Sequence, residues 1–110
     1  MANVFKNAVS ASVGTSAVDV YTAGSGVTAT VIGATVANRH SSSITVDATI
    51  TDSSASVTPF IVKEAPIGTG SSLVLIGGDQ KVVLETGDKL TITSNTASSA
   101  DVIVSVLEST

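Results

Sequence analysis

The stretch from residue 65 to residue 94 places the tightest constraint on the fold. It holds three short apolar runs, at residues 73–76, 82–84 and 90–92, and a glycine-bearing corner precedes each run. Strands that recur at roughly 8–12-residue spacing, with turn signals between them, are typical of antiparallel sandwiches and barrels. We therefore expect three adjacent strands here. Their glycines serve turns and contact loops rather than a ligand site.

Residues 43–51 show the most regular alternation in the chain. Ile44, Val46, Ala48 and Ile50 occupy every second position, and threonine or aspartate lies between them. A period of two places these four apolar side chains on one face of a strand, whereas a helix would scatter them around its surface. The segment is predicted to be a strand with one buried face.

The same alternation recurs along the chain. Residues 17–22, 57–65 and 101–108 read as further strands, and residues 27–38 form a long run that is apolar on both faces. Such a run indicates a central or bent strand, with Gly33 as a bulge or a bend. No helical period and no strand–helix–strand alternation are present. We therefore predict an all-β, antiparallel two-sheet sandwich of about eight strands, with jelly-roll or immunoglobulin-like topology.

The N-terminal segment is less regular. Residues 1–16 are expected to form an arm or an edge strand that precedes a sandwich domain at 17–110, and a short helix at 3–13 is an alternative. Asn3 and Lys6 suit an exposed edge, where charge discourages pairing with other chains. In the next strand, Val18 and Val20 share one face, so Asp19 and Tyr21 are expected on the exposed one.

The composition excludes several classes of function. The chain has no cysteine, one histidine and only 13% charged residues, against roughly 25% in a typical soluble domain. Nucleic-acid binding needs clustered basic residues, but the five here are dispersed, so no nucleic-acid partner is expected. No apolar run is long enough for a membrane span. The N-terminus lacks a signal-peptide pattern, which predicts a protein kept or assembled in a cytoplasm.

The residues that carry chemistry form no recognisable site. His40 has Asp47 and Asp52 as conceivable partners, but no serine lies in a Gly-x-Ser-x-Gly elbow, so we read His40 as a surface residue. Gly68 to Gly70 lacks the remainder of a phosphate-binding loop. The aspartates lack the spacing of a calcium-binding loop, although a calcium ion between two loops stays an alternative. We predict no catalytic residues, no cofactor and no metal.

A weakly charged, hydroxyl-rich surface favours association, because charge repulsion between copies is small. Four exposed positions are the candidate interface residues. They are Val4 and Phe5 near the N-terminus and Arg39 and His40 in a loop.

The turn and core segments together carry a resemblance to a known class. These segments are residues 20–24 (VYTAG), 28–32 (TATVI), 36–38 (VAN), Val46 with 50–54 (ITDSS), 61–67 (IVKEAPI), 75–88 (LIGGDQKVVLETGD), and Val102 with 105–108 (SVLE). In them the chain resembles the small virion structural proteins of tailed bacteriophages, notably those that infect cyanobacteria. The likeness covers nearly the whole chain from Asn3, and it brings no catalytic residues with it.

The resemblance implies a non-enzymatic role in a virion. The expected function is a capsid decoration (cement) protein that bridges capsomers on the outer head surface. The alternative is a tail, neck or fibre component, including a module that binds the host surface. The implied partners are the major capsid protein or other virion proteins and further copies of the chain, with a trimer favoured. The implied location is the virion, assembled in the host cytoplasm.

Overall fold

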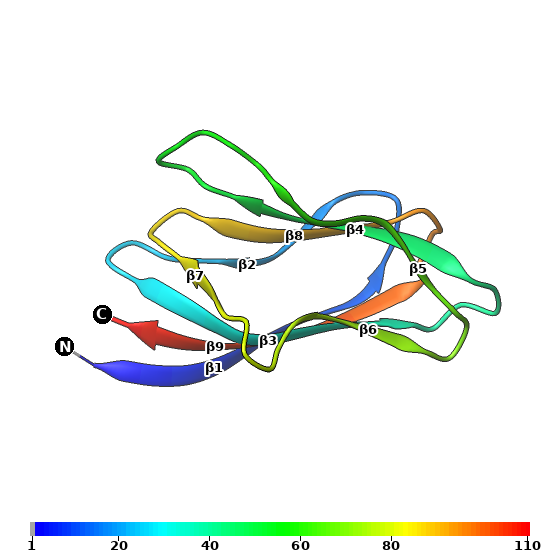
Figure 1. Ribbon diagram of the computed structural model, residues 1–110, viewed down its shortest axis with the longest axis horizontal. Coiled ribbons are helices and arrows are strands. Elements are labelled where there is room, and N and C mark those ends of the chain that lie inside the picture. The colour runs from blue at the N-terminus through cyan, green and yellow to red at the C-terminus, as the bar shows by residue number, and fades with distance from the viewer. Residues whose placement is uncertain (1) are drawn as a thin grey trace.

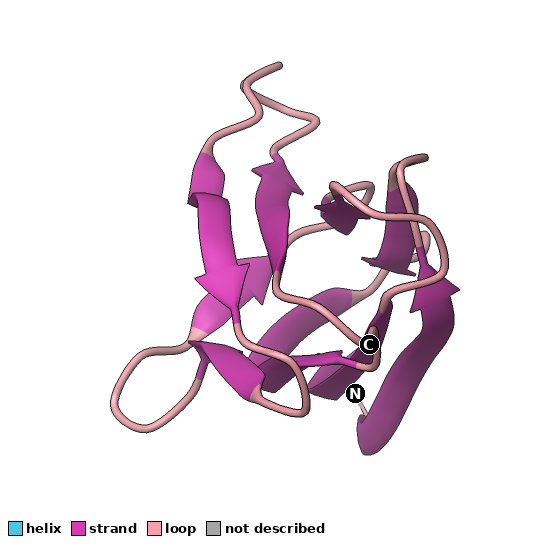
Figure 2. Cartoon of the chain, turned by 90° about the vertical axis from the view of Figure 1, so that its right-hand side faces the viewer, coloured by secondary structure: helices cyan, strands magenta, loops and turns pink. Residues whose placement is uncertain are grey.

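The computed structural model describes residues 2–110, which form two antiparallel sheets packed face to face (Figures 1 and 2). No helix occurs in this part of the chain. The predicted all-β sandwich is confirmed. Nine strands build it: β1 (Asn3–Val13), β2 (Val18–Thr22), β3 (Thr28–Asn38), β4 (Ile44–Thr51), β5 (Phe60–Ile67), β6 (Ser72–Ile76), β7 (Val82–Leu84), β8 (Lys89–Ser94) and β9 (Ala100–Ser109).

The strand pairing is nested. One sheet has the order β1-β9-β3-β6, with β7 also paired to β3, and the other has the order β2-β8-β4-β5. The first strand pairs with the last (β1 with β9), the second with the next to last (β2 with β8), β3 with β6 and β7, and β4 with β5. This is the pairing of one long antiparallel ribbon that is rolled on itself. With β6 and β7 taken as one interrupted strand, this is the eight-strand jelly roll. Of the two predicted topologies, the jelly roll is the one that the structure adopts.

Strands β6 and β7 lie end to end rather than side by side. β6 pairs with β3 at Ala34–Ala37, whereas β7 pairs with it at Ala29–Val31. The corner at Gly77 and Gly78 is therefore a loop within one interrupted strand, and β8 belongs to the opposite sheet. The prediction of three adjacent strands is wrong, because a glycine corner marks a turn without showing whether the chain reverses, continues or crosses between sheets.

A bulge explains why β3 is apolar on both faces. Val31 is opposite Val106 and Gly33 is opposite Ser105, which leaves Ile32 as an extra residue. The inward positions change phase across this point, from Ala29 and Val31 to Ala34 and Val36, and all four are buried. The predicted bulge at Gly33 is confirmed, and it brings both apolar sets into one core.

The core is almost wholly aliphatic and is built from the inner faces of both sheets. In β4, Ile44, Val46 and Ala48 are each at most 1% exposed, and Ile50 packs at the margin of the same cluster. The face predicted for this strand is correct. A buried aliphatic side chain of this size stabilises the fold by roughly 1.5–3 kcal/mol relative to an exposed one.

The N-terminal residues form a long strand at the edge of the five-stranded sheet. β1 is hydrogen-bonded to β9 from Asn3 to Val13, and Val13 is part of the core. The alternative of a short helix at 3–13 is wrong. The two ends of the chain lie side by side (Figure 1), and the Thr110 amide donates to the Ala2 carbonyl at 3.0 Å. The edge strand β1 and its neighbour β9 therefore present their outward side chains on one face.

Candidate interaction surface

The outward-facing side chains of β1, β9, β3, β6 and β7 form a surface that we call the apolar face. Cross-strand partners share a face of a sheet, so the register identifies its members. Eight large hydrophobic side chains are exposed in residues 2–110, and five of them lie on this face. They are between 57% and 75% exposed: Phe5, Val9, Val74, Val83 and Ile103.

These side chains form two rows across the sheet. Paired positions on successive strands place Phe5, Leu107, Thr30 and Val83 in one row, and Val9, Ile103, Thr35 and Val74 in the other. Smaller groups separate the rows. A shallow depression of about 420 Å³ lies there, lined by Phe5, Lys6, Asn7, Ile32, Ser105 and Val106. The face therefore has two apolar ridges with a hollow between them.

Among the outward positions of these strands, Asp101 at one end of the apolar face is charged, and Asp79 and Lys81 lie in the loop that joins β6 to β7 at its edge. Asp101 is the outward acidic residue there, and its Oδ1 lies 3.5 Å from Arg39 Nη1 and accepts the Ser12 amide at 2.9 Å. The rows themselves contain apolar and threonine side chains. Lys6 lies opposite the buried Val106, so its side chain is on the inner side of β1, where its ammonium pairs with Glu108 at 3.1 Å. The centre of the face is consequently uncharged.

The predicted interface residues fall into two separate places. Phe5 lies on the apolar face, and Val4, opposite Glu108, lies on the other side of β1 at the rim of the sandwich. Arg39 and His40 lie in the loop after β3, at the far end of the sheet. That end is eight residues of β1 away from Phe5, or about 26 Å. Arg39 reaches the border of the face through Asp101, whereas His40 stays within its own loop.

Sequence reasoning missed four of the five exposed side chains of the apolar face. Val9, Val74, Val83 and Ile103 each lie in a segment that has apolar residues at both phases, so the local pattern does not tell which side chains point outward. Recognising the group required the pairing of β1, β9, β3 and β6, which are distant in the chain.

Tyr21 is buried rather than exposed. The register of β2 with β8 shifts between Asp19 and Tyr21, and this irregularity turns Tyr21 inward to 9% exposure. Its hydroxyl donates to Glu108 Oε2 at 2.6 Å. Burial raises the pKa of Tyr21, and the Glu108 carboxylate raises it further. The pKa of Glu108 is lowered, first by the Tyr21 hydroxyl and then by Lys6. The hydrogen bond from the neutral Tyr21 phenol therefore links β2 of one sheet to β9 of the other.

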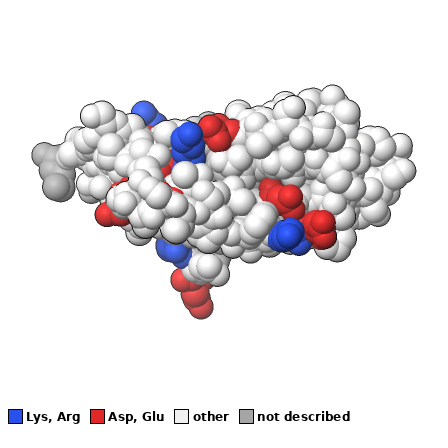
Figure 3. All heavy atoms as spheres, turned by 90° about the horizontal axis from the view of Figure 1, so that it is seen from above, with Lys and Arg blue, Asp and Glu red and all other residues white. Residues whose placement is uncertain are grey.

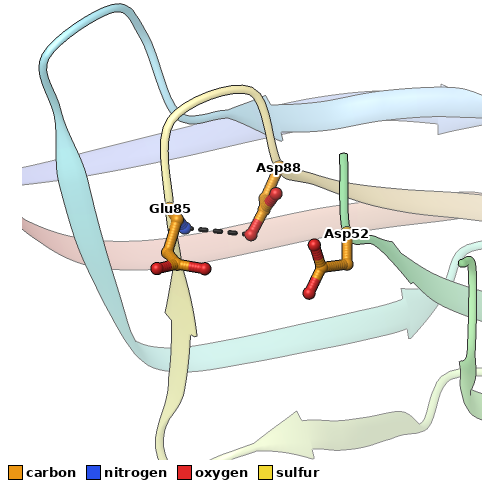
Figure 4. A group of neighbouring side chains, drawn as sticks. All are labelled: Asp52, Glu85 and Asp88. Carbon is orange, nitrogen blue, oxygen red and sulfur yellow. Dashed lines mark hydrogen bonds between the residues drawn. The ribbon is translucent and has the colours of Figure 1, made fainter. Parts of the chain in front are cut away.

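Three carboxyl groups gather where the β7–β8 turn meets the end of β4 (Figure 4). Oxygens of Asp52, Glu85 and Asp88 lie within 4.8 Å of one another. Asp88 is buried and already accepts the Glu85 amide at 3.0 Å, the Ser53 amide at 3.0 Å and the Ser53 hydroxyl at 3.2 Å. These bonds hold the turn to the neighbouring loop, which accounts for the aspartate at position 88.

Asp52 caps its own turn. Its Oδ1 accepts the amides of Ser54 and Ala55 at 3.1 Å and 3.0 Å and the Ser54 hydroxyl at 2.9 Å. These donors, the Ala55 amide first, lower the pKa of the Asp52 carboxyl. Of the aspartates considered for calcium, Asp52 and Asp88 come together here, while Asp47 accepts the Glu64 amide and Asp101 faces Arg39. The oxygens of Asp52 and Asp88 accept backbone amides and so hold the two turns in their conformations.

His40 and the aspartates considered with it have separate partners. The His40 amide donates to Asn38 Oδ1 at 2.7 Å, and its ring Nδ1 accepts the Ser42 amide at 3.2 Å. Asn38 is itself buried and donates to the carbonyls of Ser42 and Ile67 at 2.9 Å. The imidazole thus belongs to a loop organised by a buried asparagine.

No protein-family model, curated protein or solved structure matches the chain. In residues 2–110 there is also no helix with the length and apolarity needed to cross a membrane.

Proposed function

We propose that the protein is a non-enzymatic structural protein of a tailed-phage virion, acting as a capsid decoration protein that bridges capsomers on the outer head surface. One observation carries the proposal: five large, exposed hydrophobic side chains gather in two uncharged rows on the outer face of one sheet. Single exposed apolar residues are ordinary on soluble proteins. A contiguous patch of them marks a surface that binds a partner.

The arrangement of the polar residues supports a structural role. A catalytic centre needs a nucleophile, a base and an orienting group within hydrogen-bond reach of one another. Here Tyr21 binds Glu108, His40 binds its own loop and Asp88 binds its turn. Each of these side chains is engaged in holding strands or turns together, and they lie in different parts of the sandwich.

The jelly roll and the resemblance support the proposal from two further directions. Jelly rolls occur in viral capsid and lectin domains among others, although a fold by itself does not assign a function. The segments that resemble phage virion proteins include the β7–β8 turn, and the five-stranded sheet supplies the binding surface. An attachment function needs area rather than reactive groups.

Counting the chain in purified virions tests the proposal. Quantitative mass spectrometry against the major capsid protein is expected to find hundreds of copies per particle, and electron cryomicroscopy should place the sandwich on the outside of the shell. A copy number small enough for a single ring would instead support the tail or neck component. A shell map without this sandwich would overturn the decoration role.

A further inference from the structure

We propose that the apolar face binds a second copy of this chain, so that two sandwiches stack through their five-stranded sheets. The pairing concerns the isolated chain and does not depend on the virion role. Its surface is the one defined by the two rows of Phe5 and Val83 and of Val9 and Val74, and Ile103 lies within the second row on β9, between β1 and β3.

Charge favours a second copy as the occupant. In a two-fold pair each copy presents the same surface to the other, so a surface that carried several charges of one sign would repel its copy. The apolar face avoids this because its rows are uncharged and Asp101, at one end, faces Arg39 of the same chain. A partner with a charged surface would instead have to bury its charges against side chains that offer no counter-charge, which is costly.

The shape of the apolar face suits face-to-face packing of two sheets. Sheets packed face to face lie about 10 Å apart, and their side chains interdigitate. Interdigitation needs ridges on one surface and hollows on the other. The apolar face has both, because the two rows flank the depression lined by Asn7, Ile32 and Ser105. A single surface can therefore complement itself.

The area is sufficient for a specific but weak pair. Four strand positions at about 4.8 Å spacing, over roughly eight residues at about 3.4 Å, give a face of about 500 Å². Two such faces bury about 1,000 Å² in total, which is the lower bound for a specific interface. We expect a dissociation constant in the micromolar range. A trimer, as the resemblance implied, would need a further head-to-tail contact elsewhere on the sandwich.

Sedimentation velocity of the full chain over a concentration series tests this pairing. The wild type is expected to pass from monomer to dimer as its concentration rises from about 1 to about 200 μM. Ile103→Asp should remain monomeric throughout, because pairing would bury an uncompensated carboxylate in each copy. Thr49→Asp is the matched control: it adds the same charge to the outer face of the other sheet and should dimerise as the wild type does.

A milder variant covers the case in which Ile103→Asp fails to fold, as judged by circular dichroism and thermal melting. Val74→Ser should keep the fold and weaken dimerisation at least tenfold, since it removes apolar area from both copies. A wild type that stays monomeric at the highest concentration would overturn the pairing. So would dimers, trimers or larger assemblies that form equally well in the folded variants of the apolar face.

Discussion

The two outer faces of the sandwich differ in chemistry although they cover the same core. The apolar face carries large hydrophobic side chains, whereas the outer face of the four-stranded sheet, here the polar face, carries threonines. Figure 3 views the sandwich from the side of the polar face, where charged side chains are scattered among uncharged ones. The outward positions of its central strands, by register, are Thr45, Asp47, Thr49 and Thr51 of β4 and Lys89, Thr91 and Thr93 of β8.

Polar contacts complete the polar face. Lys89 Nζ lies 3.6 Å from Asp19, the Thr91 hydroxyl donates to Asp19 at 2.8 Å, and the Lys63 ammonium lies 5.5 Å from the centre of the Phe60 ring. Threonine keeps the branched shape that suits strands while offering a hydroxyl to water. A sheet that faces water needs no valine or isoleucine at these positions. On the other sheet valine and isoleucine do occupy such positions, and the pairing that we propose would cover them.

The largest effect is expected from single deletions in β3. They test whether the bulge at Ile32 determines which side chains of this strand point outward. Deleting Ile32 removes the extra residue of β3 and leaves Ala34 and Val36 pointing inward, so this variant should fold with a modest loss of stability. Deleting Thr35 moves Val36 to the outside and should abolish cooperative folding, because a one-residue slip reverses the faces. Thermal melts compare the two, and equal melting of both variants would show that the bulge does not control the phase.

The next largest effect is expected on β4, where a buried position and its outward neighbour are given the same charge. Ala48→Asp buries an unpaired carboxylate and should destabilise the fold by several kcal/mol, or about 3–5 kcal/mol by analogy with broken buried ion pairs, enough to unfold a marginally stable domain. Thr49→Asp, one residue along β4, should stay folded. Urea denaturation measures both. Similar midpoints would mean that the outward and inward faces of β4 are misassigned.

A third test concerns the hydrogen bond from Tyr21 to Glu108, which links the two sheets. The folded pKa of Tyr21 is raised above its ordinary value of 10.0, so the stability that it contributes is complete below that pH and is lost as the pH rises through the folded pKa. Melting temperature should therefore fall in alkali, and Tyr21→Phe should flatten that fall. Because this is the only tyrosine in the chain, tyrosinate absorbance reports it alone, and ionisation without unfolding would contradict the expectation.

Tyr21→Phe should also change how the melting temperature depends on pH in acid. The folded pKa of Glu108 is lowered from 4.5, so its contribution is present above that pH and is lost as the pH falls through the folded value. The Tyr21 hydroxyl is the first cause of that lowering. Tyr21→Phe should accordingly weaken the acid dependence of the melting temperature. An unchanged acid profile would show that Lys6 alone maintains the Glu108 carboxylate.

The smallest effect is expected on the polar face. Lys89→Met breaks an exposed ion pair with Asp19, and such pairs contribute little, so the free energy of unfolding should change by about 0.5 kcal/mol or less. Dimerisation in sedimentation should match the wild type. If this variant associated more strongly, charge on the polar face rather than apolar area on the other would control which face is covered.

Much of the fold was predictable from local patterns. The alternation from Ile44 to Ile50 assigned the inner face of β4, and the apolar run around Gly33 identified the bulge. The interaction surface was only partly predictable. Phe5 was selected because it is an apolar residue near an expected edge, but Val74, Val83 and Ile103 carry no local mark that separates an outward valine or isoleucine from an inward one. Tyr21 was misplaced because a shift of register is invisible in a short alternating segment.

By itself, the sequence determined the strands, the turns and the aliphatic core, because a period of two and glycine-rich corners act between neighbours in the chain. The tertiary structure decided the nested pairing, the end-to-end placement of β6 and β7, and the gathering of Phe5, Val9 and Ile103 on one face. These depend on strands that are distant in sequence, such as β1 and β9. Their register sets which outward side chains become neighbours, and no local pattern contains that information.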